Sequence, residues 1–182
     1  LIASAQRRRL PFVILESDVG PEVNSIRIDG KAGALMATRH LASLGHRAFA
    51  ILSVLRVPDA PVIHSRGTDK TNMTAARSAL DHERLEGFAM GLAEVGLSLD
   101  DVTIIETTPG DPRAGAAVFD HAPDATAVMT MSDWQAITVL DEAARRGIDV
   151  PSQVSVVGFD GTGESARTIP PLTTIAHDVV EK

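Results

Sequence analysis

Short apolar runs alternate with amphipathic segments along most of the chain. Val154–Phe159 is the clearest apolar run, and it is typical of a parallel strand buried on both faces. Similar runs predict strands at 12–15, 25–28, 48–54, 102–106 and 127–131. Apolar residues at helical spacing predict helices at 31–44, 83–95, 112–121 and 133–146. Strands that alternate with helices of this length form βαβ units, so the pattern predicts an α/β fold with a mostly parallel sheet.

Local signals support the ends of these helices. Asp29 and Ser132 precede helical patterns and are predicted N-caps, because their side chains can accept hydrogen bonds from the first free N–H groups. Gly45, Gly96 and Gly147 follow helical patterns and predict their C-terminal ends.

The segment from 56 to 80 breaks this alternation. It contains two prolines and no sustained period, which is typical of a functional loop, a lid or partial disorder. We interpret residues 56–82 as a crossover between a partial amino-terminal subdomain at 1–55 and a carboxy-terminal subdomain at 83–176. Residues 177–182 would then begin the crossover back.

Four polar residues are predicted to meet at one rim of the sheet. Arg84 is predicted at the start of a helix, and Ser132 and Asp133 at the start of another. Asp160 follows the strand 154–159, and a glycine lies on each side of the Phe159-Asp160 pair. In a βαβ unit the carboxyl end of a strand meets the amino end of the next helix, and ligands bind at that rim. The alternatives are purely structural roles: a turn cap for Asp160, an exposed surface position for Arg84 and a first-turn acid for Asp133.

The residue types at this rim suit a hydroxylated ligand. Arginine is a planar donor and an ionised aspartate is an acceptor, so Arg84 and Asp160 together complement vicinal hydroxyls. Trp134 is interpreted as a packing residue, with ligand stacking as the alternative.

Composition excludes several classes of function. The 182 residues contain no cysteine, so disulfides, thiol catalysis and thiolate zinc sites are excluded. A formal net charge of −7 argues against binding of nucleic acid by this chain alone. The six histidines lack metal-ligand spacing, and no known catalytic motif is present, so we expect no enzyme activity, no metal and no cofactor. The apolar runs are too short to span a bilayer.

Several motifs carry a family resemblance. The segment VPSQVSVVGFDG at 150–161, the later PPLTTI, RLEGF at 84–88 and HLASLGHRAFAIL at 40–52 together resemble the effector-binding core of LacI-type transcriptional regulators. The resemblance implies that Arg84 and Asp160 contact an effector beside the Ser132-Asp133 turn. It also implies an acidic pocket residue at Glu16 and a ligand-facing residue at His177.

The resemblance further implies a periplasmic-binding-protein-like fold, with a complete or nearly complete carboxy-terminal subdomain and part of the amino-terminal one. The implied function is sensing of a sugar-like small-molecule effector in a cytoplasmic homodimer, which pairs through 133–146 and 162–172. Operator DNA would be bound only through a helix-turn-helix domain that is missing from this sequence. An extracytoplasmic sugar-binding protein of a transport system shares the fold and is the alternative. An enzyme on a flavodoxin-like fold is a third interpretation, and it lacks a catalytic set.

Overall fold

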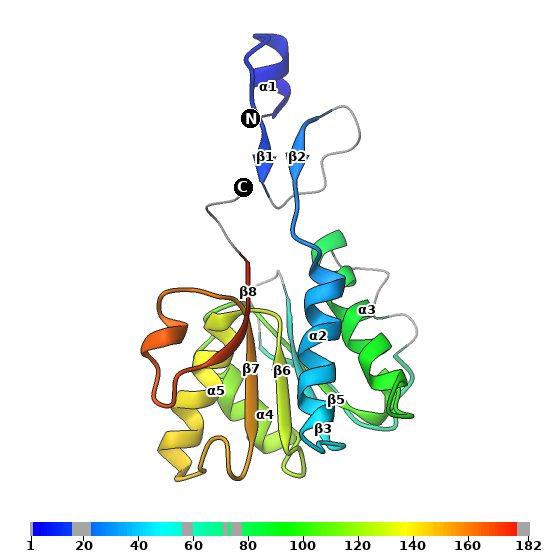
Figure 1. Ribbon diagram of the computed structural model, residues 1–182, viewed down its shortest axis with the longest axis vertical. Coiled ribbons are helices and arrows are strands. Elements are labelled where there is room, and N and C mark those ends of the chain that lie inside the picture. The colour runs from blue at the N-terminus through cyan, green and yellow to red at the C-terminus, as the bar shows by residue number, and fades with distance from the viewer. Residues whose placement is uncertain (1, 16–22, 56–59, 71–72, 74–77, 178–182) are drawn as a thin grey trace.

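A six-stranded sheet forms the centre of the molecule. The computed structural model describes residues 2–15, 23–55, 60–70, 73 and 78–177 (Figure 1). The strand order is β4-β5-β3-β6-β7-β8, and every neighbouring pair is parallel except β4 and β5. The strands are β3 (Phe49–Val54), β4 (Val62–His64), β5 (Thr103–Thr107), β6 (Ala127–Thr130), β7 (Ser155–Asp160) and β8 (Thr173–Ala176). The expected α/β fold with a mostly parallel sheet is confirmed.

Two pairs of helices cover the two faces of this sheet. Helices α2 (Gly30–Ser43) and α3 (Ala79–Ala93) lie on one face, and α4 (Ala114–His121) and α5 (Asp133–Arg146) lie on the other (Figure 1). Each face has its own apolar cluster. Phe88 and Phe159 are fully buried under α2 and α3, and Ala136 and Val139 are fully buried on the α5 side.

Helices α2 and α3 approach closely because α3 carries glycines where they meet. A Cβ atom added at Gly87 would lie 2.2 Å from the backbone oxygen of Lys31, and one at Gly91 would lie 2.4 Å from the Cβ of Thr38. Gly33 in α2 likewise leaves room for the ring of Phe159. This packing fixes α3 beside α2, so that α3 contacts β3 and α2 contacts β6, β7 and β8.

A small separate unit precedes the sheet. It contains α1 (Ile2–Arg7) and the parallel pair β1 (Ile14–Leu15) and β2 (Ser25–Ile26). In Figure 1 this unit lies beyond the carboxyl ends of the large sheet. Two short 3-10 helices, at Leu99–Asp101 and Ser165–Arg167, complete the regular structure.

The six-stranded sheet crosses the division that we expected at residue 55. Helix α2 and strand β3 precede that division, but α2 packs on α3 and β3 is central in the sheet with β5 and β6. The alternation of strands and helices could not reveal this, because it does not state which strands are neighbours. We therefore propose that residues up to about 28 represent the amino-terminal subdomain and that the crossover into the larger unit precedes α2.

The segment 56–80 also differs from the expected loop. Strand β4 lies within it and pairs antiparallel with β5, and α3 begins at Ala79, four residues before the predicted start. The predicted caps of α2 and α5 are confirmed. Asp29 accepts a hydrogen bond from the Ala32 N–H at 2.8 Å, and Ser132 accepts one from the Gln135 N–H at 3.2 Å. No helix in the described ranges is both long enough and apolar enough to cross a membrane.

Candidate ligand-binding site

The strand order creates a crevice at the carboxyl ends of β3 and β6. The chain leaves β3 for α3 on one face of the sheet and leaves β6 for α5 on the other face, so the neighbouring strands β3 and β6 flank a topological switch point. Ligands of open α/β sheets bind at such points. A cleft of about 460 Å³ lies there. Its lining residues are Val54, Leu55, Leu80, Asp81, Arg84, Thr108, Pro109, Met131, Ser132, Trp134 and Asp160.

Arg84 is held over the ends of β6 and β7 by three contacts. Its guanidinium donates to the backbone oxygen of Met131 and, at 3.4 Å, to Oδ1 of Asp160. The guanidinium carbon lies 3.9 Å from the centre of the Phe159 ring, which is a cation–π distance. The side chain is 15% exposed, so the alternative of a free surface arginine is excluded. The expected position at the amino end of a helix is wrong, because α3 starts at Ala79 and Arg84 lies in its second turn.

Asp160 has an unusual backbone conformation. Its φ angle is 126°, which residues with a side chain rarely adopt, and Gly161 follows at φ 70°. Such conformations persist where the surrounding structure imposes them, and they cluster at functional sites. Burial raises the pKa of the Asp160 carboxyl above its ordinary value; the Arg84 guanidinium opposes that rise, and the nearby Asp133 carboxylate adds to it. The carboxyl therefore lies in a poorly solvated rim position beside the Arg84 guanidinium.

Ser132 and Asp133 have different roles although they are adjacent. Ser132 lines the cleft and caps α5. Asp133 is fully buried and accepts hydrogen bonds from the Thr162 N–H (2.7 Å), the Thr162 hydroxyl (2.9 Å) and the Thr174 hydroxyl (2.5 Å). Asp133 therefore ties α5 to the segment after β7 and to β8. We expected Asp133 to line the cleft, and it does not.

His177 follows β8 beside Asp160. Asp160 pairs with Ala176 in the register of β7 and β8, and the charge of His177 acts on the Asp160 carboxyl. The Nδ1 atom of His177 is buried and has no hydrogen-bond partner among the residues that the structure describes. His177 does not line the cleft, and its expected contact with the ligand stays a prediction. Glu16 lies outside the described residues.

Trp134 was interpreted from the sequence as a packing residue, and the structure corrects this. Its side chain is 53% exposed and lines the cleft at the first turn of α5. Adjacent positions on a helix point about 100° apart, so Trp134 can face the cleft while Asp133 faces inward. The sequence signal that could have identified Trp134 is its place in the first turn of the helix that follows a strand in a βαβ unit.

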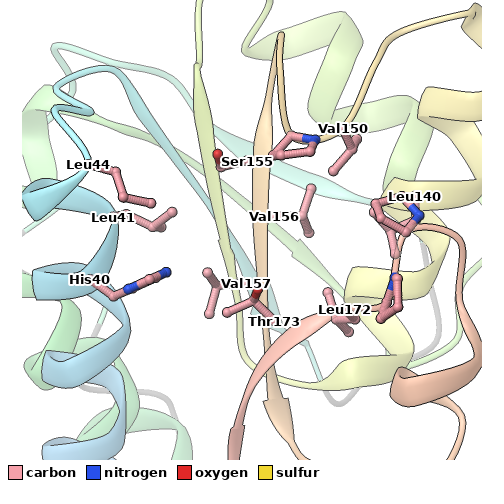
Figure 2. Close-up of a pocket in the computed structure, with 13 residues that line it drawn as sticks. His40, Leu41, Leu44, Leu140, Val150, Ser155, Val156, Val157, Leu172 and Thr173 are labelled. Atoms are coloured by element: carbon pink, nitrogen blue, oxygen red, sulfur yellow. The ribbon is translucent and has the colours of Figure 1, made fainter.

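A second pocket lies at the opposite end of β7. Figure 2 shows it between the last turns of α2, the start of β7 and residues 170–173. It has a volume of about 230 Å³, and side chains such as Leu41, Val156 and Leu172 make its lining mainly apolar. Ligand sites need a few convergent polar groups, and no arginine, lysine, aspartate or glutamate lines this pocket. The cleft at the switch point therefore fits a polar ligand better. Among the described residues, no group of three or more histidine, aspartate or glutamate side chains could hold a metal ion.

Comparison with known proteins identifies the family of this fold. A family model described as a periplasmic binding protein-like domain matches residues 38–182. The transcriptional regulator DegA of Bacillus subtilis is 32% identical over 99% of this chain and 48% of its own length, and the transcriptional repressor CytR of Escherichia coli is 27% identical over 94% and 46%. The chain thus spans about half the length of these curated relatives.

Solved structures show the same fold. A LacI-family regulator from Corynebacterium glutamicum is 26% identical, with a TM-score of 0.78 over 95% of this chain and 51% of its own. A LacI-family regulator from Enterococcus faecium, solved with bound ribose, is 23% identical, with a TM-score of 0.79 over 98% of this chain and 60% of its own. This chain belongs to the periplasmic binding protein-like domain family, and it is similar to about half of the length of LacI-type transcriptional regulators.

Proposed function

We propose that this chain senses a sugar-like small molecule, which binds in the cleft at the carboxyl ends of β3, β6 and β7. The observation that carries the proposal is the pairing of Arg84 with Asp160 at the switch point, beside the Ser132 hydroxyl. The group offers a charged donor, a charged acceptor and a hydroxyl within one cleft. A vicinal diol can accept from the arginine and donate to the aspartate at the same time.

The pair makes only a long contact with itself, so both groups can engage a ligand. The Arg84–Asp160 distance is 3.4 Å, whereas well-formed charged hydrogen bonds are about 2.7–2.9 Å long. A ligand hydroxyl that bridges the two groups from the open side of the cleft would accept from Arg84 and donate to Asp160, and both of these bonds would be shorter than the long contact. Arg84 meanwhile keeps its bond to Met131 and its contact with Phe159, so it is oriented before the ligand arrives. The regulator from Enterococcus faecium, which has the same fold, was solved with a bound sugar, ribose.

Binding at this rim can be coupled to a change in shape. The unit formed by α1, β1 and β2 lies beyond the carboxyl ends of the large sheet (Figure 1), so a ligand at the rim lies between two parts of the molecule. A ligand that favours one arrangement of these parts shifts the population toward it. In the intact cytoplasmic regulator this shift would change the affinity of a helix-turn-helix domain for operator DNA.

The proposal is tested on the intact regulator by operator-binding anisotropy. A panel of pentoses, hexoses and ribonucleosides is added to the complex of regulator and operator. We expect at least one compound to change operator affinity in the natural protein and to lose that effect in Arg84→Ala, while the variant still binds operator without the compound. A panel member that acts equally on both proteins would overturn the proposal, and so would a panel without effect.

A further inference from the structure

The cleft at the switch point has a polar end and an apolar end. Arg84, Ser132 and Asp160 gather at the ends of β6 and β7. Leu55 and Pro109 follow β3 and β5, with the Thr108 hydroxyl beside them. The carboxylate of Asp81, which also lines the cleft, is hydrogen-bonded to the Ser78 hydroxyl at 2.5 Å and belongs to the start of α3.

The two ends are farther apart than one sugar ring can span. Three inter-strand spacings of about 4.8 Å, or roughly 14 Å, separate β5 from β7 in the sheet. A monosaccharide that bonds to Arg84 and Asp160 therefore leaves the apolar end of the cleft uncovered. A free monosaccharide is also polar around its whole edge, so it does not match Leu55 and Pro109.

Trp134 lines the same cleft and offers it a flat apolar surface. Its ring is 53% exposed, which is unusual for a tryptophan that contributes only to packing. Leu80, at the start of α3, adds a further half-buried apolar side chain to the same cleft. A flat ring laid on Trp134 would gain stacking in addition to the burial of apolar area.

From this division we infer that the cleft takes a two-ring ligand: a sugar ring whose hydroxyls meet Arg84 and Asp160, joined to a flat ring that stacks on Trp134. The shared chemistry is a sugar with a planar substituent, which a nucleoside and an aryl glycoside both provide. Trp134 is the residue that distinguishes these ligands from free sugars. The inference rests on the proposed function, because it assigns the ligand class of the same cleft.

The experiment compares matched ligands by calorimetry on the intact regulator. The pairs are ribose with uridine, ribose with adenosine, glucose with 4-nitrophenyl glucoside, and galactose with 4-nitrophenyl galactoside. In at least one pair the two-ring member should bind about tenfold more tightly than its free sugar, which is the effect of one stacked ring. The nucleoside and glycoside pairs distinguish the two sources of the flat ring.

Three variants assign the difference to Trp134. Trp134→Ala should abolish the tenfold preference while leaving the affinity for the free sugar unchanged, and Trp134→Phe should keep most of the preference. Leu44→Ala removes a side chain of similar exposure, 61%, outside this cleft and should change neither affinity. Arg84→Ala should weaken both members of a pair by the same factor. Melting curves should coincide for natural protein and Trp134 variants, because the ring is exposed.

Fluorescence gives an independent readout. Trp134 is the only tryptophan of this 182-residue chain. The difference between the emission spectra of the natural protein and Trp134→Phe reports on that ring, and it should change on addition of the two-ring ligand but not of the free sugar.

Tight binding of free sugars that depends on Arg84 but not on Trp134 would overturn this inference and leave the proposed function standing. An equal loss of affinity for both members of a pair in Trp134→Ala would also overturn the inference, because the ring would then act on closure of the molecule rather than on the flat part of the ligand. Binding by no member of any pair would contradict the inference as well.

Discussion

Asp133, Trp134 and Asp160 show how the roles of single residues are decided by small rotations of the chain. Arg84, Ser132 and Asp160 could be placed at one rim from sequence, because the ends of parallel strands and the starts of the following helices share one edge of a sheet. Which of two neighbours on α5 faces the cleft could not be predicted, because it depends on the rotation of the helix over the sheet. The positive φ angle of Asp160 likewise has no sequence signal beyond the flanking glycines.

The raised pKa of Asp160 predicts a stability penalty at neutral pH. An acid whose pKa is raised on folding contributes stability that is present below the unfolded pKa and is lost as the pH rises through the folded pKa. Asp160→Asn removes this loss, so its melting temperature should exceed that of the natural protein at pH 7. The difference should shrink as the pH falls toward 3.8, the ordinary value of the group. A variant that is less stable at pH 7 in calorimetric melts would contradict the assignment of burial as the main cause.

Asp133 should matter for folding and not for ligand recognition. Asp133→Ala leaves the Thr162 N–H and two hydroxyls without their acceptor, and unpaired buried donors of this kind destabilise by about 1–3 kcal/mol. Asp141→Ala is the matched control on the same helix, because Asp141 is exposed and should change stability by less than about 0.5 kcal/mol. Urea unfolding curves measure both. Equal stability of the two variants would show that Asp133 is not the tie between α5 and β8.

At the scale of elements, local signals determined the accuracy of prediction. Both ends of α5 were predicted because Ser132 and Gly147 are recognisable as cap residues in the sequence. In the structure Ser132 is the N-cap, and Gly147 ends the helix at a φ angle of 67°. The start of α3 was missed because its cap, Ser78, lies in a stretch without period. Strands β4 and β8 were missed because each is a short edge strand whose character comes from pairing with a distant strand.

The contact between α2 and α3 should be sensitive to a single methyl group. Gly87→Ala places a Cβ against the backbone of Lys31, where nothing can rotate away, and overpacking of this kind destabilises by about 1–3 kcal/mol. The gain in helix propensity, roughly 1 kcal/mol, offsets only part of this. Met90→Ala is the control on the same helix, because Met90 is 42% exposed. If urea unfolding shows that Gly87→Ala is as stable as the control variant, the close approach of the two helices is wrong.

At the scale of the whole molecule, the fold class and the rim were predictable and the division of the chain was not. The alternation of strands and helices predicts a parallel sheet with ligands at its carboxyl edge. It does not state where one sheet ends and another begins, so α2 and β3 were assigned to a different unit from the sheet that contains β3 and that α2 covers.

We propose that the intact regulator is a homodimer that pairs through α5 and the segment 162–172. Ile169 is 94% exposed and offers apolar surface for such pairing, whereas Leu172, also expected there, is buried in its own chain. Ile169→Asp should shift the sedimentation of the intact protein toward the monomer at micromolar concentration. Met36→Asp, at a 62% exposed position on α2, is the control and should not. A natural protein that sediments as a monomer would refute the pairing.

The most direct test of the central claim is titration of Arg84→Ala and Asp160→Asn by calorimetry, with the compound that changes operator affinity, beside their melting curves. Each charged hydrogen bond contributes about 1.5–3 kcal/mol, so each variant should bind roughly ten- to a hundredfold more weakly than the natural protein. Both variants should still unfold cooperatively, since neither side chain belongs to the apolar clusters. Unchanged affinity in both variants, or loss of the folded state in either, would show that Arg84 and Asp160 are structural residues and not the ligand-binding site.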